Sequence, residues 1–306
     1  MSKINNYQKP FLKWVGGKTQ IINDIVNTIP TQIQNYHEIF LGGGSVLLAV
    51  LSLQKQGKIT ITGNVCAYDL NEQLINVYKN VQKNKDEMFM KITEYVNTYS
   101  KITGTEINRD PNTLEQATTS RESYYYWLRK KYNEIIDKTS VDCSALFMVI
   151  NKTCFRGMYR EGPRGYNVPF GHYKTVPTVI TRQEIDNVSE LIKNVKFVHC
   201  DFQVSMENVS QGDVMYLDPP YAPETTTSFV KYTSDGFGLD KHDALFTLIK
   251  ELHTKKNISF VMSNAKVNLV TDAFCDYTCQ DIVARRAIHS KNPGDTTVEV
   301  VISGLL

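Results

Sequence analysis

The sequence lacks several features that would direct it to particular functions. No apolar run is long enough to span a lipid bilayer, and the N-terminus has no secretory signal peptide, so we expect an intracellular protein with no membrane partner. The six cysteines form no CxxC pair and no Cys/His spacing typical of a metal site. We therefore expect reduced, mostly buried thiols and no bound metal.

The chain also has little excess of charge of either sign. Its 34 basic and 32 acidic side chains give a net charge of +2, which does not by itself indicate nucleic-acid binding. The local distribution is uneven, because residues 151–174 contain five basic side chains and a single acidic one, Glu161. Such a segment can contact phosphate groups even when the whole chain is nearly neutral.

Both ends of the 306-residue chain show an alternation of strand-like and helix-like patterns. We expect strands at residues 36–40, 65–68, 195–200, 214–217, 258–262 and 297–302, and helices at residues 46–51 and 240–254. The middle differs, because helical patterns at residues 86–99 and 123–136 flank a polar loop at residues 104–120. The sequence therefore predicts an α/β domain formed by residues 1–78 and 179–306, with a mainly helical insert at residues 79–178.

A glycine-rich turn follows the first expected strand, in Phe40-Leu41-Gly42-Gly43-Gly44. Glycine suits a tight strand-to-helix turn that a ligand approaches closely, although three glycines can also form a simple flexible turn. Asp69 lies 25 residues past Gly44, at the end of the next expected strand, where an acid can accept hydrogen bonds from ribose hydroxyls. The pattern favours a cofactor with an adenosine group over a dinucleotide, because Leu47 replaces the last glycine of G-x-G-x-x-G.

The tetrapeptide Asp218-Pro219-Pro220-Tyr221 follows the strand expected at residues 214–217. The chain has ten prolines, so an adjacent pair between Asp and Tyr is unusual. The prolines predict a rigid loop at the carboxyl end of a strand, where open α/β sheets bind ligands. A surface turn in which Asp218 caps a helix is the alternative.

These four residues suit chemistry at the exocyclic N6 amine of adenine. The lone pair of this nitrogen is delocalised into the ring, so the amine is a poor nucleophile. The Asp218 carboxylate and the Pro219 carbonyl can both accept hydrogen bonds from the amine, which favours a tetrahedral nitrogen with a free lone pair. Tyr221 supplies an aromatic face that can stack on a base extruded from a duplex.

Taken together, these motifs resemble the Dam-type (D12 class, alpha group) DNA adenine-N6 methyltransferases along nearly the whole chain. The segment at residues 11–18, FLKWVGGK, is similar to their N-terminal cofactor motif, and residues 38–45, EIFLGGGS, are similar to their FxGxG motif. Residues 68–71, YDLN, resemble their ribose-binding segment, and residues 218–223 resemble their catalytic loop. The resemblance implies a Rossmann-like sheet that binds S-adenosyl-L-methionine, and an enzyme that methylates adenine.

The resemblance also implies individual roles in binding this cofactor. Asp69 would bind the ribose, Asp201 would lie near the cofactor adenine, and Asp218 would contact both the cofactor and the target amine. The full set of implied cofactor-binding residues is Trp14, Lys18, Phe40, Gly42, Gly44, Asp69, Asp201 and Asp218. From the residues alone, Trp14 fits a core aromatic and Lys18 a solvated lysine at a helix start.

The insert resembles the family's target-recognition region, which implies double-stranded DNA as the partner. Arg160 would contact guanine with two hydrogen bonds, and Phe155 would wedge into the duplex as the adenine leaves. Contacts to bases are implied for Met158, Pro169 and Tyr173, and contacts to phosphates for Lys152, Arg156 and Lys174. An ordinary basic loop is the alternative.

The target sequence suggested by the resemblance is GATC. Two departures weaken that inference: Phe155-Arg156 stands where the family often has an aromatic-Asn pair, and the segment between Arg160 and Tyr166 is one residue short. Residues 285–292, which include Arg285 and Arg286, resemble a segment near DNA or form a solvated basic loop.

Other expectations follow from the family, and two alternatives to it stay open. A cognate restriction endonuclease would act on the same site, the enzyme would be a monomer or weak dimer, and the cell would be a bacterium or a virus-infected host. The first alternative is a DNA-binding protein without catalysis. The second is a methyltransferase of RNA or of protein glutamine, although Asp218 rather than Asn argues against glutamine.

Overall fold

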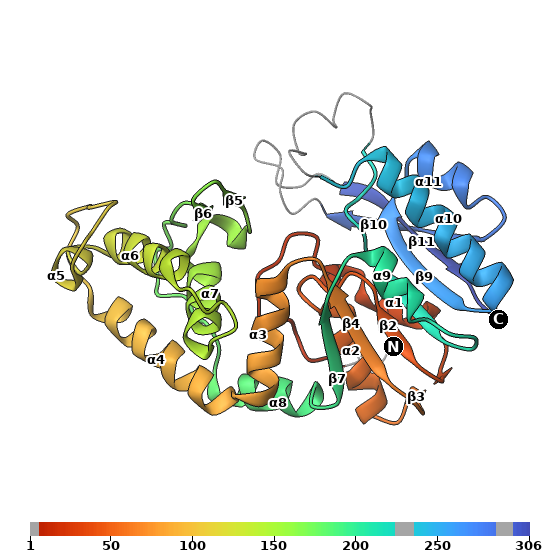
Figure 1. The fold of residues 1–306 in the computed structure, drawn as a ribbon, viewed down its shortest axis with the longest axis horizontal. Coiled ribbons are helices and arrows are strands. Elements are labelled where there is room, and N and C mark those ends of the chain that lie inside the picture. Colours follow the sequence, from red (N-terminus) through yellow and green to blue (C-terminus); the bar gives the residue numbers. More distant parts are fainter. Residues whose placement is uncertain (1–5, 224–235, 286–295) are drawn as a thin grey trace.

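The computed structural model describes residues 6–223, 236–285 and 296–306, and its centre is a seven-stranded, mostly parallel sheet (Figure 1). The strands are β2 (Tyr36–Glu38), β4 (Val65–Asp69), β7 (Val195–His199), β8 (Val214–Leu217), β9 (Ser259–Ala265), β10 (Thr278–Arg285) and β11 (Thr296–Gly304). Their spatial order is β10-β11-β9-β8-β2-β4-β7, and β11 runs antiparallel to both of its neighbours. The expected α/β class with a mostly parallel sheet is confirmed.

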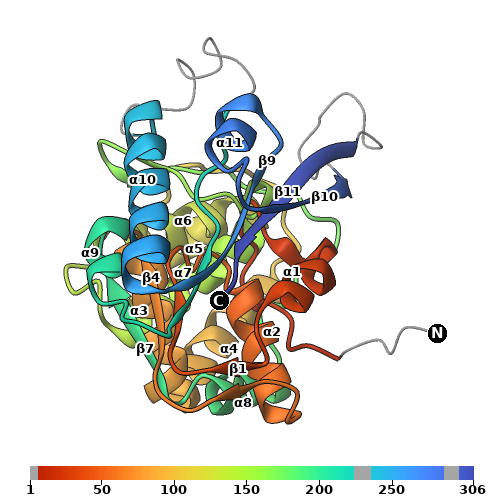
Figure 2. The same ribbon diagram turned by 90° about the vertical axis from the view of Figure 1, so that its right-hand side faces the viewer.

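Helices cover both faces of this sheet and enclose two hydrophobic cores. One face packs on α1 (Ile22–Thr28), α2 (Ser45–Lys55), α3 (Glu72–Lys83) and α8 (Arg182–Leu191). The other face packs on α9 (Phe202–Glu207), α10 (Leu239–Lys256) and α11 (Asn268–Ala273). Figure 2 shows α9 and α10 on one side of the strands and α1 and α2 on the other. Successive residues of a strand point to opposite faces of the sheet and so pack in different cores. Val300, for example, belongs to one hydrophobic core and its neighbour Val301 to the other.

The middle of the chain forms a helical lobe to one side of the sheet (Figure 1). It contains α4 (Lys85–Lys101), α5 (Leu114–Ala117), α6 (Arg121–Glu134) and α7 (Val141–Thr153), followed by the hairpin strands β5 (Glu161–Gly162) and β6 (Gly165–Tyr166). The lobe shares the core of the α3 face, and the Asn80 amide on α3 donates a buried 2.8 Å hydrogen bond to the Ser144 hydroxyl on α7. The boundary expected between residues 78 and 79 falls inside α3, and the first helix of the lobe, α4, begins at Lys85.

The remaining elements of the described chain are two short strands and two 3-10 turns. Strands β1 (Gln32–Ile33) and β3 (Thr60–Ile61) form a separate parallel pair, and 3-10 turns occur at η1 (Lys18–Gln20) and η2 (Phe155–Gly157). All six cysteines lie in the described part of the chain and are free. None of the helices in that part is long and apolar enough to cross a membrane.

Local sequence explains where most of these helices begin. Asn71, Ser120, Ser140 and Thr181 accept hydrogen bonds from the first turns of α3, α6, α7 and α8, and Thr181 forms a full capping box with Glu184. Helix α7 was not predicted, because ten of its 13 residues are buried and the sequence shows no polar face. Strand β10 was also missed, since its sequence lacks an apolar alternation and its partner β11 supplies the pairing.

The order of the strands in the sheet determines where the site lies. The strand β2 lies between β4 and β8, so the connections after β2 and β8 diverge to opposite sides of the sheet. Such a switch point opens a crevice at the carboxyl ends of the strands. The glycine turn follows β2 and Asp218 follows β8, so both reach this crevice. Because β11 is antiparallel, its beginning also lies at this edge.

Candidate active site

The centre of the site is an ion pair between Lys18 and Asp218, residues 200 positions apart in the chain. The Lys18 ammonium lies 2.8 Å from the Asp218 carboxylate, and the two side chains are 5% and 21% exposed. The same ammonium donates a 2.6 Å hydrogen bond to the Gly16 carbonyl, and the Lys18 backbone N–H donates to the Ser45 hydroxyl. Lys18 is therefore buried at the site rather than solvated, and Asp218 pairs with it instead of capping a helix.

The Tyr221 ring lies against one side of this ion pair. Its ring centroid lies 4.7 Å from the Lys18 ammonium, within the range of a cation–π contact. Its hydroxyl donates a 2.7 Å hydrogen bond to the Glu299 carboxylate on β11. Pro219 is buried and Pro220 is exposed, and the Asn264 side chain accepts a hydrogen bond from the Ala222 backbone N–H just beyond the loop. The loop is therefore fastened from two neighbouring strands.

Opposing influences act on the ionisation of Asp218. Burial raises its pKa above the ordinary value for aspartate, the Lys18 ammonium lowers it, and the Glu299 carboxylate raises it. Burial is the largest of these effects, so the net pKa is raised. Lys18 thus offsets part of the effect of burial and favours the ionised form of this carboxylate.

The glycine turn and Asp69 meet directly. The Gly42 backbone N–H donates a 2.8 Å hydrogen bond to one oxygen of Asp69, and the Asn71 N–H donates a 2.8 Å bond to the other. A carboxylate has about four acceptor positions, so two remain for ligand hydroxyls. Gly44 has a φ of 66°, and a Cβ at this position would overlap the Tyr78 hydroxyl, so glycine is required there.

Aromatic side chains flank the turn on both sides. Trp14 is half-buried and lies against Gly42 and Gly43, with its ring 5.7 Å from that of Tyr159 in the lobe. On the other side, the ring of Phe40 lies 6.0 Å from that of Phe202.

Phe237 and Asp201 complete this second side of the turn. The Phe237 ring lies 5.9 Å from the Phe40 ring and 5.5 Å from the Phe202 ring, so the three form one aromatic cluster. Asp201 stands directly before Phe202 and caps α9, where it accepts a 3.0 Å hydrogen bond from the Gln203 N–H. Three aromatic rings and the Asp201 carboxylate therefore lie on this side of the glycine turn.

A buried acid, Glu38, lies beneath the site at the end of β2. It is 1% exposed, and it accepts hydrogen bonds from the Tyr36 hydroxyl at 2.7 Å and the Leu47 N–H at 3.1 Å. Burial raises the pKa of Glu38 to about 8, partly offset by these hydrogen bonds. Glu38 thus links the strand before the glycine turn to the helix after it.

This pKa predicts how stability depends on pH. Between the ordinary pKa of 4.5 and about 8, folded Glu38 holds a proton that the unfolded chain has lost, so stability falls as pH rises. We expect the free energy of unfolding of the wild type to fall between pH 6 and pH 8 by up to about 3 kcal/mol more than that of Glu38→Gln. Urea unfolding at both pH values measures this, with the exposed Glu207→Gln as control; equal pH slopes for wild type and Glu38→Gln would contradict it.

The hairpin of the lobe presents the side chains predicted to contact DNA. Phe155 is 42% exposed, and the Arg156 guanidinium lies 5.2 Å from its ring. Arg156 has a φ of 56°, a conformation uncommon for arginine, and this turns the chain sharply after α7. Both side chains project from the surface, as a wedge and a phosphate contact would require.

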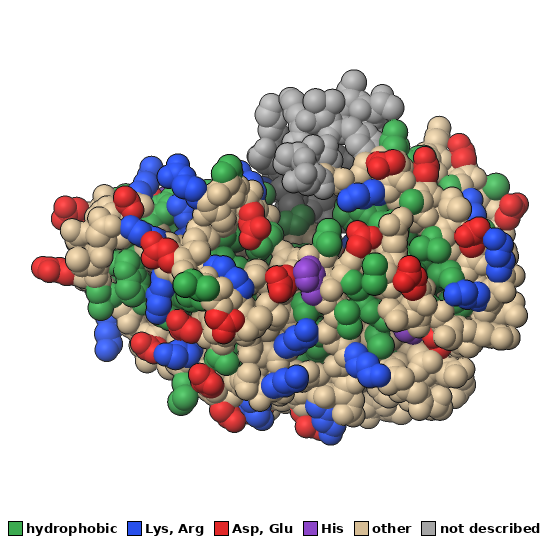
Figure 3. Space-filling model, in the orientation of Figure 1, with side chains coloured by type: hydrophobic (Ala, Val, Ile, Leu, Met, Phe, Trp, Pro, Cys, Tyr) green, Lys and Arg blue, Asp and Glu red, His purple; other side chains and the backbone are tan. Residues whose placement is uncertain are grey.

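Arg160 is held across the hairpin. Its Nε donates a 2.6 Å hydrogen bond to the Asn167 side-chain oxygen, and a terminal nitrogen donates a 3.2 Å bond to the Asn167 carbonyl. The side chain is exposed, and three of its five N–H donors remain available. Pro169 and Lys174 are also exposed, and Met158 is half-buried against the core. In the space-filling view, Lys and Arg side chains gather along the upper edge of the lobe (Figure 3).

The N-terminal motif and the hairpin are joined by Lys13, a residue that the sequence did not single out. Its ammonium donates a 2.9 Å hydrogen bond to the Tyr173 hydroxyl and lies 4.2 Å from the centroid of that ring. Its backbone N–H donates to the Asn151 side chain at 2.9 Å, and the Asn151 amide donates back to the Lys13 carbonyl at 2.8 Å. The segment that carries Trp14 and Lys18 is thereby clamped to the base of the hairpin.

Comparison with known proteins decides the family. The sequence matches the D12 class N6 adenine-specific DNA methyltransferases over residues 14–288. The chain belongs to this family. It is similar to the Type II methyltransferase M.MjaIII of Methanocaldococcus jannaschii, with 33% identity over 92% of this chain and 93% of the relative. It is also 29% identical to the DNA adenine methylase of Haemophilus influenzae, over 93% of this chain and 89% of that protein.

The predicted activity, an adenine-specific DNA methyltransferase, is therefore confirmed. The alternative of an RNA or glutamine methyltransferase does not fit this family. The match extends through the lobe and through every strand of the sheet except β11, which begins at Thr296.

Sequence reasoning also missed Glu38, Asn264 and Glu299 of this methyltransferase. Asn264 and Glu299 lie in strands with several apolar residues, and Glu38 directly precedes the apolar residues 39–41. That contrast is the signal that could have revealed them. The predicted segment at residues 286–292 lies outside the described residues, and of Arg285 only its place at the end of β10 is described.

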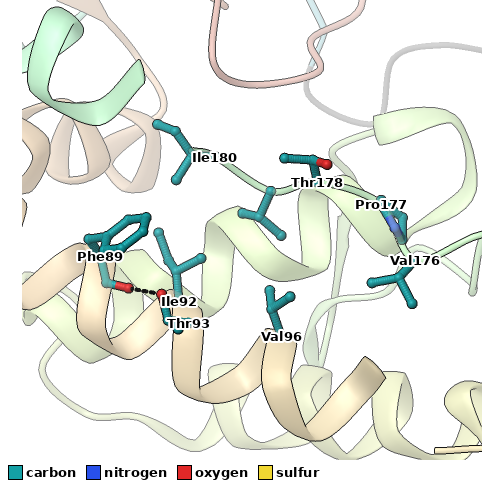
Figure 4. A pocket seen from close by; sticks show the side chains of 9 residues that line it. Phe89, Ile92, Thr93, Val96, Val176, Pro177, Thr178 and Ile180 are labelled. Atoms are coloured by element: carbon teal, nitrogen blue, oxygen red, sulfur yellow. Dashed lines mark hydrogen bonds between the residues drawn. The ribbon is translucent and has the colours of Figure 1, made fainter. Parts of the chain in front are cut away.

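An apolar cavity elsewhere in the methyltransferase does not belong to the site. It has a volume of about 200 Å³ and lies between α4 and residues 176–180 (Figure 4). Its lining includes Phe89, Ile92 and Val96 and contains no charged side chain, and the Thr93 hydroxyl donates a 2.7 Å hydrogen bond to the Phe89 carbonyl. Without acids, bases or free polar groups it offers nothing for catalysis.

The Lys18–Asp218 pair predicts the pH dependence of the methyltransferase. The methylation rate should fall as pH decreases through the raised pKa of Asp218, because protonation removes the negative charge that strengthens its hydrogen bonds to Lys18 and to the target amine. In Lys18→Met the pKa of Asp218 rises further, so the fall should move to higher pH by at least about one unit. Rates at saturating cofactor across pH measure this shift, and Lys196→Met, which removes an exposed lysine on β7, serves as the control. An unchanged profile in Lys18→Met would show that the pair does not set the ionisation of Asp218.

Proposed function

We propose that this methyltransferase uses S-adenosyl-L-methionine to methylate the N6 amine of an adenine flipped out of a short, specific duplex DNA site. The observation that carries the proposal is the position of Asp218. It lies at the carboxyl end of β8, paired with Lys18 and covered by Tyr221, next to the crevice formed by the glycine turn and Asp69. This arrangement puts a carboxylate and an aromatic ring beside a site suited to an adenosine group.

The residues around the crevice fit S-adenosylmethionine. Asp69 retains free acceptor positions for the ribose hydroxyls, and the cluster of Phe40 and Phe202 offers aromatic faces for the adenine, with Asp201 beside them. Trp14 and Gly42 would complete the pocket on its other side. When bound, this cofactor supplies the electrophilic methyl group.

The protein's own residues would prepare the target amine. Asp218 and the Pro219 carbonyl accept hydrogen bonds from the two amine hydrogens, which draws the nitrogen lone pair out of conjugation with the ring. The carboxylate also stabilises the positive charge that the nitrogen acquires as its new bond forms. Tyr221 stacks on the extruded base and holds it at Asp218, so positioning and electrostatics provide the catalysis.

The lobe would act as the target-recognition domain, corresponding to residues 79–178. Arg160 would contact guanine, Phe155 would fill the space left by the extruded adenine, and Met158, Pro169 and Tyr173 would contact neighbouring bases. Contacts to phosphates would come from Lys152, Arg156 and Lys174. We infer GATC as the site from the resemblance of residues 151–174 to the family's target-recognition region.

One experiment tests the activity, the cofactor and the site together. The purified protein is incubated with tritiated S-adenosylmethionine and unmethylated plasmid DNA, and the modified bases are then mapped by sequencing. We expect N6-methyladenine within one short recurrent sequence, and no label in RNA of matching sequence. Label in RNA, or methylation without a recurrent sequence, would contradict the proposal.

A further inference from the structure

We propose that Glu299 is a positioning residue for the reaction, which holds the Tyr221 ring in the orientation that faces the adenine at Asp218. The inference rests on the proposed function, because it assigns Tyr221 to the target base. Nothing in the catalytic loop itself points to Glu299, which lies 78 residues further along the chain.

The fold brings Glu299 to the loop through the reversed direction of β11. Parallel strands end at the catalytic edge, whereas β11 begins there, and its residue Glu299 pairs in register with Ala265 at the end of β9. The residues that follow it, Val300 and Val301, are both buried in apolar cores. Glu299 is itself half-buried, and the Tyr221 hydroxyl is a hydrogen-bond partner of its carboxylate.

The Tyr221 ring is held at two points. Its hydroxyl donates a 2.7 Å bond to Glu299, and its face lies 4.7 Å from the Lys18 ammonium. Burial, Asp218 and Glu299 all raise the pKa of Tyr221, so the phenol keeps its proton and remains a donor. A hydrogen bond to a carboxylate is stronger than one between neutral groups, so it restricts the rotation of the ring.

The backbone of the loop has its own, separate support. The Asn264 side chain accepts a 3.1 Å hydrogen bond from the Ala222 N–H, and this bond does not involve the Glu299 side chain. Removal of the Glu299 carboxylate should therefore release the Tyr221 ring while the loop stays in place. This separation distinguishes a positioning role from a general effect on folding.

The test compares Glu299→Ala, Glu299→Gln, Tyr221→Phe and the double variant Glu299→Ala/Tyr221→Phe on a duplex that contains the mapped target site. We expect kcat to fall roughly ten- to a hundredfold in Glu299→Ala, the scale of a misplaced catalytic group, with the KM for S-adenosylmethionine unchanged. Tyr221→Phe keeps the ring but loses the same hydrogen bond, so its kcat should fall to a similar extent. The double variant should be no slower than either single variant, because both remove one interaction.

Two further measurements complete the test. Glu299→Gln retains an acceptor oxygen and should recover most of the rate, and Glu251→Ala, which removes an exposed carboxylate on α10, should match the wild type. If Tyr221→Phe or a folded Glu299→Ala has the wild-type kcat, or if their effects multiply in the double variant, the inference is overturned. A wild type that methylates no adenine would instead overturn the proposed function, so the two failures are distinguishable.

Discussion

Asp218→Ala is expected to lower the rate of adenine methylation by about 10² to 10³-fold, the range seen when one preorganised electrostatic contact is removed from an active site. The variant loses the acceptor that would engage the target amine. It also leaves the Lys18 ammonium, which is 5% exposed, without its 2.8 Å partner. Single-turnover rates with tritiated S-adenosylmethionine and saturating duplex measure the loss.

Two comparisons separate this chemical effect from misfolding. Asp218→Asn keeps the shape and one acceptor oxygen but loses the charge, so its rate should lie between those of the wild type and Asp218→Ala. Asp240→Ala removes an exposed carboxylate from the first turn of α10 and should leave the rate unchanged. Wild-type activity in a folded Asp218→Ala protein would rule out the mechanism proposed for the amine.

Arg160→Ala is expected to lower kcat/KM on the cognate site by roughly 5- to 150-fold, the equivalent of about 1–3 kcal/mol for one bidentate contact to a base. The structure supports this role, because Asn167 holds the guanidinium through Nε and one terminal nitrogen and leaves other donors exposed. The loss should be much smaller on DNA that has another base pair in place of the guanine contact. Competition between cognate and altered duplexes measures the difference.

Further variants at Arg160 and Arg164 distinguish a contact to guanine from a contact to phosphate. Arg160→Lys keeps the charge but not the planar pair of donors, so it should lose discrimination almost as fully as alanine. Arg164→Ala, an exposed arginine in the same hairpin, should weaken binding to all sequences to a similar, small extent. If Arg160→Ala weakens all duplexes equally and only changes the salt dependence, Arg160 contacts phosphate rather than guanine.

Local patterns were enough to predict six of the seven strands of the sheet close to their observed positions. Strand β8 begins and ends at the expected residues, and β4 and β7 differ by one residue at one end. A strand of this kind can be predicted from neighbouring residues, because it is a short apolar run bounded by turn residues. The segment from residues 141–153 could not be predicted in the same way, because a helix that is buried all round shows no periodicity.

The sequence by itself determined the family and the chemistry of this protein. The glycine turn, Asp69 and the 218–221 loop are short motifs, and their residue types and order are enough to identify both. Only the tertiary structure decided which side chains meet. The Lys18–Asp218 pair, the Lys13–Asn151 clamp and the Tyr221–Glu299 hydrogen bond join residues 200, 138 and 78 positions apart. No local pattern encodes such contacts. The Lys18–Asp218 and Tyr221–Glu299 contacts arise from the strand order β8-β2-β4 and from the reversed strand β11, which bring distant segments to one edge of the sheet. The Lys13–Asn151 clamp arises where the N-terminal segment packs on α7.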